Sequence, residues 1–171
     1  TGLLSLVAKE IEKEHIKIIG IEEILSGVLT EEGLLAGPAP TKISWDDIKR
    51  GLHVLNNLGP CDVGQSVAVQ EGLVLAVEAI EGTDKMIERA GGLKRNVSGP
   101  ILIKISKVNQ DKRVDLPTAG PETVKNAIRA GFQGLALEAN NSLLLDKDRV
   151  LKIAEKNAFF VIGVDQSKVL Q

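Results

Sequence analysis

Residues 134–164 read GLALEANNSLLLDKDRVLKIAEKNAFFVIGV, and this run places the chain among the α/β proteins. The short apolar run 134–138 predicts a strand, and the apolar spacing of residues 146–156 predicts a helix. A second apolar run over residues 159–164 predicts another strand. Strand, helix and strand in this order are typical of layered α/β folds that contain parallel strand pairs.

The same alternation continues toward the N-terminus. We expect a strand over residues 101–105, an extended segment over 113–116 before Pro117, and a helix over 121–130 that Pro121 opens. Two runs rich in β-formers, 66–70 and 73–79, flank Glu71-Gly72 and predict a tight hairpin. The predicted fold class is α/β, with a mixed sheet, flanking helices and one β-hairpin.

The first 60 residues are less regular. They predict a helix over 2–13, a brief strand over 16–19 and a helical turn over 21–25. Residues 26–43 have little periodicity, and Gly37–Pro40 (GPAP) is a strong chain breaker that we interpret as a boundary between segments 1–42 and 43–171. A helix follows from Ser44, with Asp47 in a capping box, and ends at Gly59-Pro60. We expect Thr83 to cap a helix over 84–90.

Composition excludes several classes of protein. The chain has 171 residues, a formal net charge of −2 and 2% aromatic residues, a poor basis for binding nucleic acid by charge or by base stacking. The single cysteine, Cys61, excludes an internal disulfide framework. No apolar run approaches the roughly 20 residues of a membrane span, and we see no secretory signal, so we expect a cytoplasmic protein.

Residues 109–118, NQDKRVDLPT, form the first candidate site. Extended backbone places Asp111, Arg113 and Asp115 on one face, and a helix would also bring the two carboxylates together. Carboxylate oxygens suit Mg²⁺ or Mn²⁺, and an arginine suits phosphate. The alternative is a solvated charged loop.

A second group of polar residues lies at the ends of predicted strands. Glu78 falls within an apolar run, and Glu81, Thr83 and Asp84 follow at the start of a helix. A carboxylate in an apolar strand is usually paired, bound to metal or functional, although Glu78 could simply end its strand. Lys104 falls inside the otherwise apolar run 101–105 and either snorkels to the edge or reaches a polar site. Asp62 and Gln65 precede the hairpin and could face a common cleft or only form the turn.

Other catalytic arrangements are absent from the sequence. His15 and His53 are isolated, and there is no Walker loop, no dinucleotide-binding fingerprint and no nucleophile elbow. Attack by water with the help of a metal ion is therefore the more natural enzymatic interpretation.

Several of these blocks together resemble a known family. DVGQS (62–66), VEAIEGTD (77–84), Lys104, QDKRVDLPTAGP (110–121), LLLD (143–146) and FVIGV (160–164) are similar, in this order, to the UDP-2,3-diacylglucosamine pyrophosphatases of the LpxI type. The resemblance covers residues 44–164 as the family's C-terminal domain, and residues 1–42 resemble the tail of its N-terminal domain. Asn140 stands where the family pattern has Gly, an exchange that fits because Asn tolerates positive φ.

The resemblance implies that the substrate's pyrophosphate is cleaved by water to lipid X and UMP in lipid A synthesis, with Mg²⁺ or Mn²⁺. It implies catalytic roles for Asp115, Asp111 and Glu78, and metal ligation by Asp111, Asp115, Glu81 and Asp84. It implies substrate binding by Lys104, Arg113, Gln110, Thr83, Thr118, Asp62 and Gln65. It also implies a lipid-linked UDP-sugar as partner, peripheral contact with the inner membrane and a homodimer. Because most of the N-terminal domain would be missing, we expect poor hydrolysis by this chain alone.

Two other functions stay open at this point. The same cations and helix N-termini would serve a non-catalytic module that binds a nucleotide or sugar phosphate. A purely structural domain would leave its acidic clusters on the surface.

Overall fold

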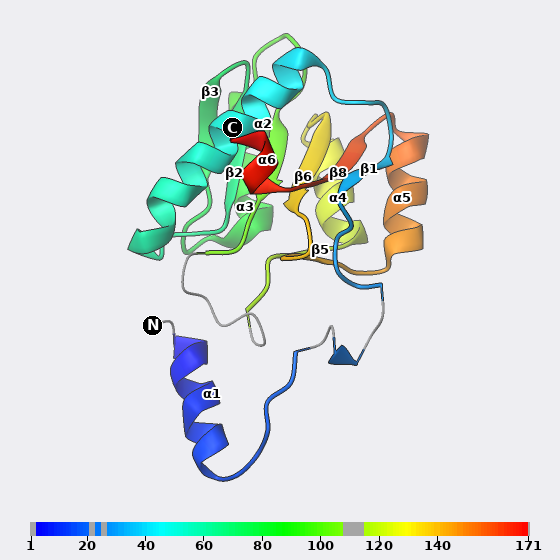
Figure 1. The fold of residues 1–171 in the computed structure, drawn as a ribbon. Helices are drawn as coiled ribbons and strands as arrows, with labels where there is room; N and C mark the ends of the chain where they lie inside the picture. Colours follow the sequence, from blue (N-terminus) through cyan, green and yellow to red (C-terminus); the bar gives the residue numbers. More distant parts are fainter. Residues whose placement is uncertain (1–2, 21–22, 25–26, 108–114, 171) are drawn as a thin grey trace.

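The computed structural model describes residues 3–20, 23–24, 27–107 and 115–170. Its centre is a six-stranded mixed sheet of order β1-β8-β6-β4-β2-β3 (Figure 1). The strands are β1 (Gly33–Ala36), β2 (Ser66–Gln70), β3 (Leu73–Val77), β4 (Ile101–Lys104), β6 (Gly134–Glu138) and β8 (Phe160–Val164). A separate parallel pair joins β5 (Thr118–Ala119) to β7 (Leu143–Leu144). The predicted fold class is confirmed.

Helices cover both faces of the large sheet (Figure 1). Helix α2 (Lys42–Leu58) packs on β2 and β4, and short helix α6 (Gln166–Val169) lies beside it through a bond from Asn56 to Gln166. Helices α3 (Gly82–Leu93), α4 (Pro121–Arg129) and α5 (Lys147–Lys156) pack side by side on the opposite face. A 3₁₀ turn, η2 (Gly59–Cys61), follows α2.

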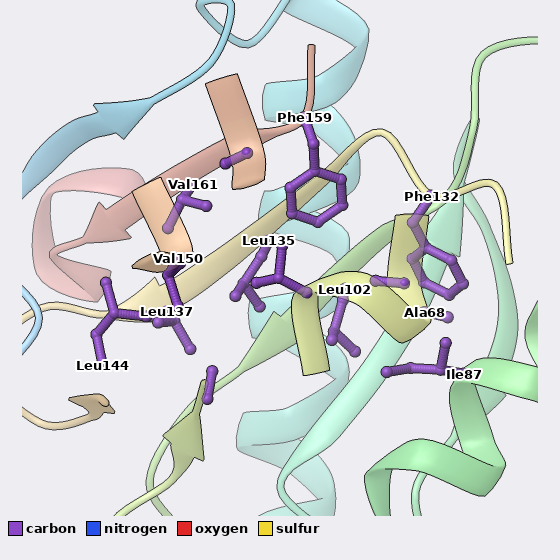
Figure 2. Close-up of a cluster of buried hydrophobic side chains, with 14 of the residues drawn as sticks. Ala68, Ile87, Leu102, Phe132, Leu135, Leu137, Leu144, Val150, Phe159 and Val161 are labelled. Atoms are coloured by element: carbon purple, nitrogen blue, oxygen red, sulfur yellow. The ribbon is translucent and has the colours of Figure 1, made fainter. Parts of the chain in front are cut away.

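The core consists of two aliphatic layers, one on each face of the sheet. Figure 2 shows the layer beneath α3, α4 and α5, where Leu102, Leu135 and Leu137 of the sheet meet side chains such as Ile87 and Val150 from the helices. On the other face, Ile48, Leu52 and Leu55 of α2 pack against the sheet. The alternation of successive strand residues between the two layers explains why every residue of β2, β4, β6 and β8 is buried.

Parallel pairing follows the predicted alternation. Strand β6 pairs in parallel with both β4 and β8, and the β2–β3 hairpin joins the sheet antiparallel to β4. The hairpin turn is Glu71-Gly72, as predicted, and both residues have positive φ, 48° and 76°. Asn140 also has positive φ, 59°, a conformation that asparagine tolerates.

The N-terminal part shows the largest differences from prediction. Helix α1 (Leu3–Lys13) is confirmed and lies away from the sheet (Figure 1). The strand over residues 16–19 is wrong, because no strand in the described part of the chain pairs with it. The turn over 21–25 falls mostly outside the described residues. Strand β1, in the segment expected to be irregular, is new and pairs antiparallel with β8, so residues 1–42 contribute a strand to the main sheet.

Two predicted helix caps are wrong. Thr41, not Ser44, caps α2, because its side chain accepts a hydrogen bond from the Ser44 amide at 3.1 Å. Asp47 instead accepts from the amides of Glu71 and Gly72 at 2.8 and 2.6 Å, which ties α2 to the hairpin turn. Helix α3 begins at Gly82 after Glu81, and Thr83 lies in its first turn. None of the helices in the described ranges is both long and apolar enough to cross a bilayer.

Candidate functional site

Polar side chains gather at one edge of the large sheet. The parallel strands β4 and β6 end there on Lys104 and Glu138, β2 begins there at Ser66, and Glu78 directly follows β3. In open α/β sheets, ligands bind in the crevice outside the carboxyl ends of the parallel strands. Strand topology therefore places the candidate site at this edge.

Glu78, Thr83 and Lys104 meet at the edge in one hydrogen-bonded chain. The Lys104 ammonium donates to the Thr83 hydroxyl at 2.8 Å, and this hydroxyl donates to Glu78 Oε1 at 3.0 Å. Lys104 comes from β4, Glu78 from the end of β3 and Thr83 from the first turn of α3, and Ser66 Oγ lies 3.4 Å from the Thr83 hydroxyl. Three residues singled out from the sequence are thus brought together.

The cluster is buried and charged. Lys104 is 4% exposed and Glu78 is 9% exposed. Burial lowers the pKa of Lys104, because the ammonium loses hydration, and the negative charges of Glu78 and Asp84 partly oppose that shift. Glu78 Oε2 is buried without a hydrogen-bond partner among the described residues. The cluster therefore contains polar capacity that the described residues do not satisfy.

Close backbone packing holds Glu78 in place. The Glu78 amide donates to the Ser66 carbonyl at 2.9 Å. A Cβ on Gly64 would lie 2.0 Å from the Glu78 carbonyl oxygen, so only glycine fits at position 64 without a shift of the backbone. The DVGQS segment thus contributes a close approach at Gly64 as well as its polar side chains.

The other acidic residues of the VEAIEGTD block point elsewhere. Glu81 is ion-paired with Arg89, and its hydrogen bond to Arg89 lowers the pKa of its carboxyl group. Exposed Asp84 accepts from Asn126 of α4 at 3.0 Å. In the described part of the chain, no three His, Cys, Asp or Glu residues assemble into a group that could hold a metal ion. These residues alone do not fit a metal ion, and we derive no step through one.

The remaining predicted site residues lie around this edge or outside the described residues. Asp62 is exposed and pairs with Lys107 at 2.6 Å, and the bond to Lys107 lowers the pKa of Asp62. Gln65 Oε1 is buried without a partner among the described residues. The Thr118 hydroxyl donates to the Leu116 carbonyl at 3.0 Å, and Asp115 is half-buried before β5. Outside the described residues lie Gln110, Asp111 and Arg113.

Sequence reasoning missed Glu138 at the same edge. Glu138 is buried, and its Oε2 accepts from the Ser106 amide at 2.8 Å and from the Ser106 hydroxyl at 2.6 Å. Its Oε1 accepts from Asn141 at 3.0 Å. The sequence carries the same signal here as for Lys104, a charged residue inside an otherwise apolar run. Glu138 anchors the chain where it leaves β4, two residues after Lys104.

A cleft of about 550 Å³ opens between α3 and α4. Its lining combines the cations Lys85, Lys94 and Arg129 with Asp84 and Glu88. Asp84 belongs both to this cleft and to the electrostatic surroundings of Lys104. The cleft therefore lies beside the first turn of α3, where the buried cluster is held.

Comparison with known proteins gives two matches. The LpxI C-terminal domain family matches residues 31–162. The UDP-2,3-diacylglucosamine pyrophosphatase LpxI of Caulobacter vibrioides is 40% identical over 170 residues, which cover 96% of this chain and 61% of that protein. The chain thus spans about three fifths of the length of this relative.

Proposed function

We propose that this chain, which belongs to the LpxI family, takes part in the hydrolysis of UDP-2,3-diacylglucosamine to lipid X and UMP. The name of the Caulobacter relative supports this reaction. Residues 43–171 would form the catalytic-type domain, and residues 1–42 would be the remnant of a preceding domain and its linker. The chain would act in the cytoplasm at the inner membrane, where its lipid-linked substrate lies, and as a homodimer.

The observation that carries the proposal is the buried Lys104 ammonium at the sheet edge. An ammonium has three N–H donors, and the described residues accept from only one of them, through Thr83. Buried donors seek acceptors, and a cation at this depth favours an anionic one. A diphosphate oxygen supplies both the lone pair and the charge. We therefore assign Lys104 to the substrate's diphosphate.

Other roles rest on the resemblance to the family. Asp115, Asp111 and Glu78 are proposed as catalytic groups, and Asp111, Asp115, Glu81 and Asp84 as ligands for Mg²⁺ or Mn²⁺. Arg113, Gln110, Thr118, Asp62 and Gln65 are proposed to contact the substrate. Cations that neutralise the developing charge and a carboxylate that positions water are what hydrolysis of a phosphoanhydride requires.

A non-catalytic module that binds a nucleotide or sugar phosphate is the second candidate. It is favoured by one observation, the lack of a three-carboxylate metal group in the part of the chain that the structure describes. Lys104 and the neighbouring cleft would serve binding equally well.

The test measures UMP release from UDP-2,3-diacylglucosamine by the chain, with Mg²⁺ and with EDTA, and UDP binding by calorimetry. Lys104→Met is compared with Lys152→Met, which removes an exposed lysine of α5 that does not belong to the cleft between α3 and α4. We expect slow UMP release that EDTA abolishes, with both release and UDP affinity lost in Lys104→Met and kept in Lys152→Met. UDP binding without turnover identifies the binding module. If the chain shows no turnover and does not bind UDP, both functions are refuted.

A further inference from the structure

We propose that Thr83 is a positioning residue that holds the Lys104 ammonium apart from Glu78 and directs it toward the substrate's diphosphate. The inference rests on the proposed function, because it concerns the same lysine. It differs from the role that the family resemblance implies for Thr83, which is direct substrate binding.

The hydrogen bonds around Thr83 have a fixed direction. An ammonium only donates, and an ionised carboxylate only accepts, so the hydroxyl between them must accept from Lys104 and donate to Glu78. The single proton of the Thr83 hydroxyl is thus committed to Glu78, and one lone pair is committed to Lys104. A hydroxyl used on both sides is poorly placed to bind substrate itself and well placed to hold its neighbours.

Thr83 also keeps two opposite charges apart. Lys104 and Glu78 are both buried and interact electrostatically, yet no direct ion pair within 4.0 Å joins these two described residues. In a buried site, an ammonium and a carboxylate attract strongly, and a direct pair would use N–H donors that a ligand could otherwise accept. The Thr83 hydroxyl takes the position between them, so two donors of the ammonium stay available.

The local backbone explains why residue 83 reaches this position. Gly82 has φ of 79°, a left-handed conformation that glycine adopts without strain, and the chain turns there from β3 into α3. The turn brings the first side chain after Gly82 between the end of β3 and the end of β4. Thr83 is half-buried, which places the hydroxyl between the buried cluster and the molecular surface.

Removal of the Thr83 hydroxyl should let Lys104 and Glu78 form a direct ion pair. In Thr83→Val, a methyl group replaces the hydroxyl at nearly constant volume, and both Lys104 and Glu78 lose a partner. The shortest way to satisfy both groups is a direct Lys104–Glu78 pair, which withdraws the ammonium from the substrate. We expect UDP affinity and kcat/KM to fall about ten- to hundredfold, the usual scale for a misplaced active-site group. Thr83→Ser keeps the hydroxyl and should stay within about threefold of the unchanged protein.

Formation of this ion pair can be tested by a rescue experiment, because a purely structural role of Thr83 predicts no rescue. The double variant Thr83→Val with Glu78→Gln removes the charge that attracts Lys104, so it should regain most of the UDP affinity that Thr83→Val loses. Thr30→Val is the control, because Thr30 is a buried threonine whose hydroxyl also accepts a hydrogen bond, from Ser142 at 2.8 Å. It should lower Tm and leave UDP affinity unchanged.

The measurements are UDP affinity by calorimetry, kcat/KM for UMP release and Tm for each variant. If Thr83→Val does not fold, Thr83→Ala replaces it, since alanine is favourable in a helix. Thr83→Val or Thr83→Ala with unchanged UDP affinity overturns the inference, and so does a Thr83→Ser variant as impaired as Thr83→Val. Failure of the double variant to bind UDP better than Thr83→Val also overturns it.

Failure of the inference can be told apart from failure of the proposed function. If Lys104→Met loses UDP binding while Thr83→Val keeps it, Lys104 binds the diphosphate without help from Thr83, and only the positioning role is wrong. If the unchanged protein neither binds UDP nor releases UMP, the proposed function and the inference are refuted together.

Discussion

Replacement of Asp47 by alanine should strongly destabilise the fold, because one buried carboxylate holds the hairpin turn. Asp47 is 1% exposed and accepts the amides of Glu71 and Gly72 at 2.8 and 2.6 Å. A hydrogen bond to a charged group contributes about 1.5–3 kcal/mol. Both turn residues are exposed, so water can replace the carboxylate, and the lower end of that range applies. Two bonds then amount to about 3 kcal/mol.

The loss can be measured as a change in the free energy of unfolding. For a chain of this length, about 3 kcal/mol corresponds to a Tm decrease of roughly 6–12 °C. Urea and thermal unfolding followed by circular dichroism would measure both quantities. Asp47→Asn should lower the free energy of unfolding by about 2 kcal/mol, less than Asp47→Ala does. The asparagine amide keeps one acceptor and turns a donor toward the second turn amide.

The neighbouring residue provides the control. Asp46 is exposed on the same turn of α2, so Asp46→Ala removes the same carboxylate without touching the hairpin. We expect it to change the free energy of unfolding by less than about 0.5 kcal/mol. If Asp47→Ala is no more destabilising than Asp46→Ala, the turn does not depend on Asp47 and the reasoning is wrong.

Three further predictions follow from single contacts. Gly64→Ala should cost about 1–3 kcal/mol and weaken UDP binding, since its Cβ would meet the Glu78 carbonyl at 2.0 Å. Gly92→Ala, which meets nothing within 4 Å, should stabilise α3 in the same unfolding experiment, and equal effects would contradict the packing argument. Glu71→Asn should raise stability by about 0.5–1 kcal/mol, because φ is 48° at Glu71 and asparagine suits this type of turn; an unchanged urea midpoint would refute it. Burial lowers the pKa of Lys104 below 10.5, so the ammonium loses its charge at a lower pH than an exposed lysine does. UDP affinity should therefore decline before pH reaches 10.5 in the unchanged protein. In Lys104→Arg it should stay constant over this range, because the guanidinium keeps its proton. Calorimetry at increasing pH tests this, and a constant UDP affinity in both proteins contradicts it.

The elements that could be predicted from the sequence are those with a strong local period. The strands β4, β6 and β8 are apolar runs between chain breakers, and the Glu71-Gly72 hairpin follows from two β-rich runs separated by two residues. Of these elements, β8 and Lys104 of β4 also belong to the blocks that resemble the family. These features depend on neighbours in the chain, so local patterns are enough to find them.

The elements that were missed or misassigned depend on distant partners. Strand β1 has only four residues and becomes a strand by pairing with β8, far away in the sequence. The apolar run 16–19 looks equally like a strand, but it joins neither of the two sheets in the described part of the chain. Asp47 fits a capping box by spacing and instead holds a turn 24 residues away. Glu138 carries the same local signal as Lys104, but its place at the site edge depends on a contact with Ser106, 32 residues away.

Local patterns in the chain are enough to predict the α/β class, the hairpin, most helix and strand positions and the family resemblance, because propensity, periodicity and motif order are local properties. Which polar residues share a site depends on the packing of segments that lie far apart in the sequence. Glu78, Thr83 and Lys104 meet because β3, β2 and β4 are neighbours in the sheet order and α3 turns back over their ends. Strand order and hydrogen-bond direction arise from packing between distant segments, so no local pattern could show that Thr83 lies between the ammonium and the carboxylate.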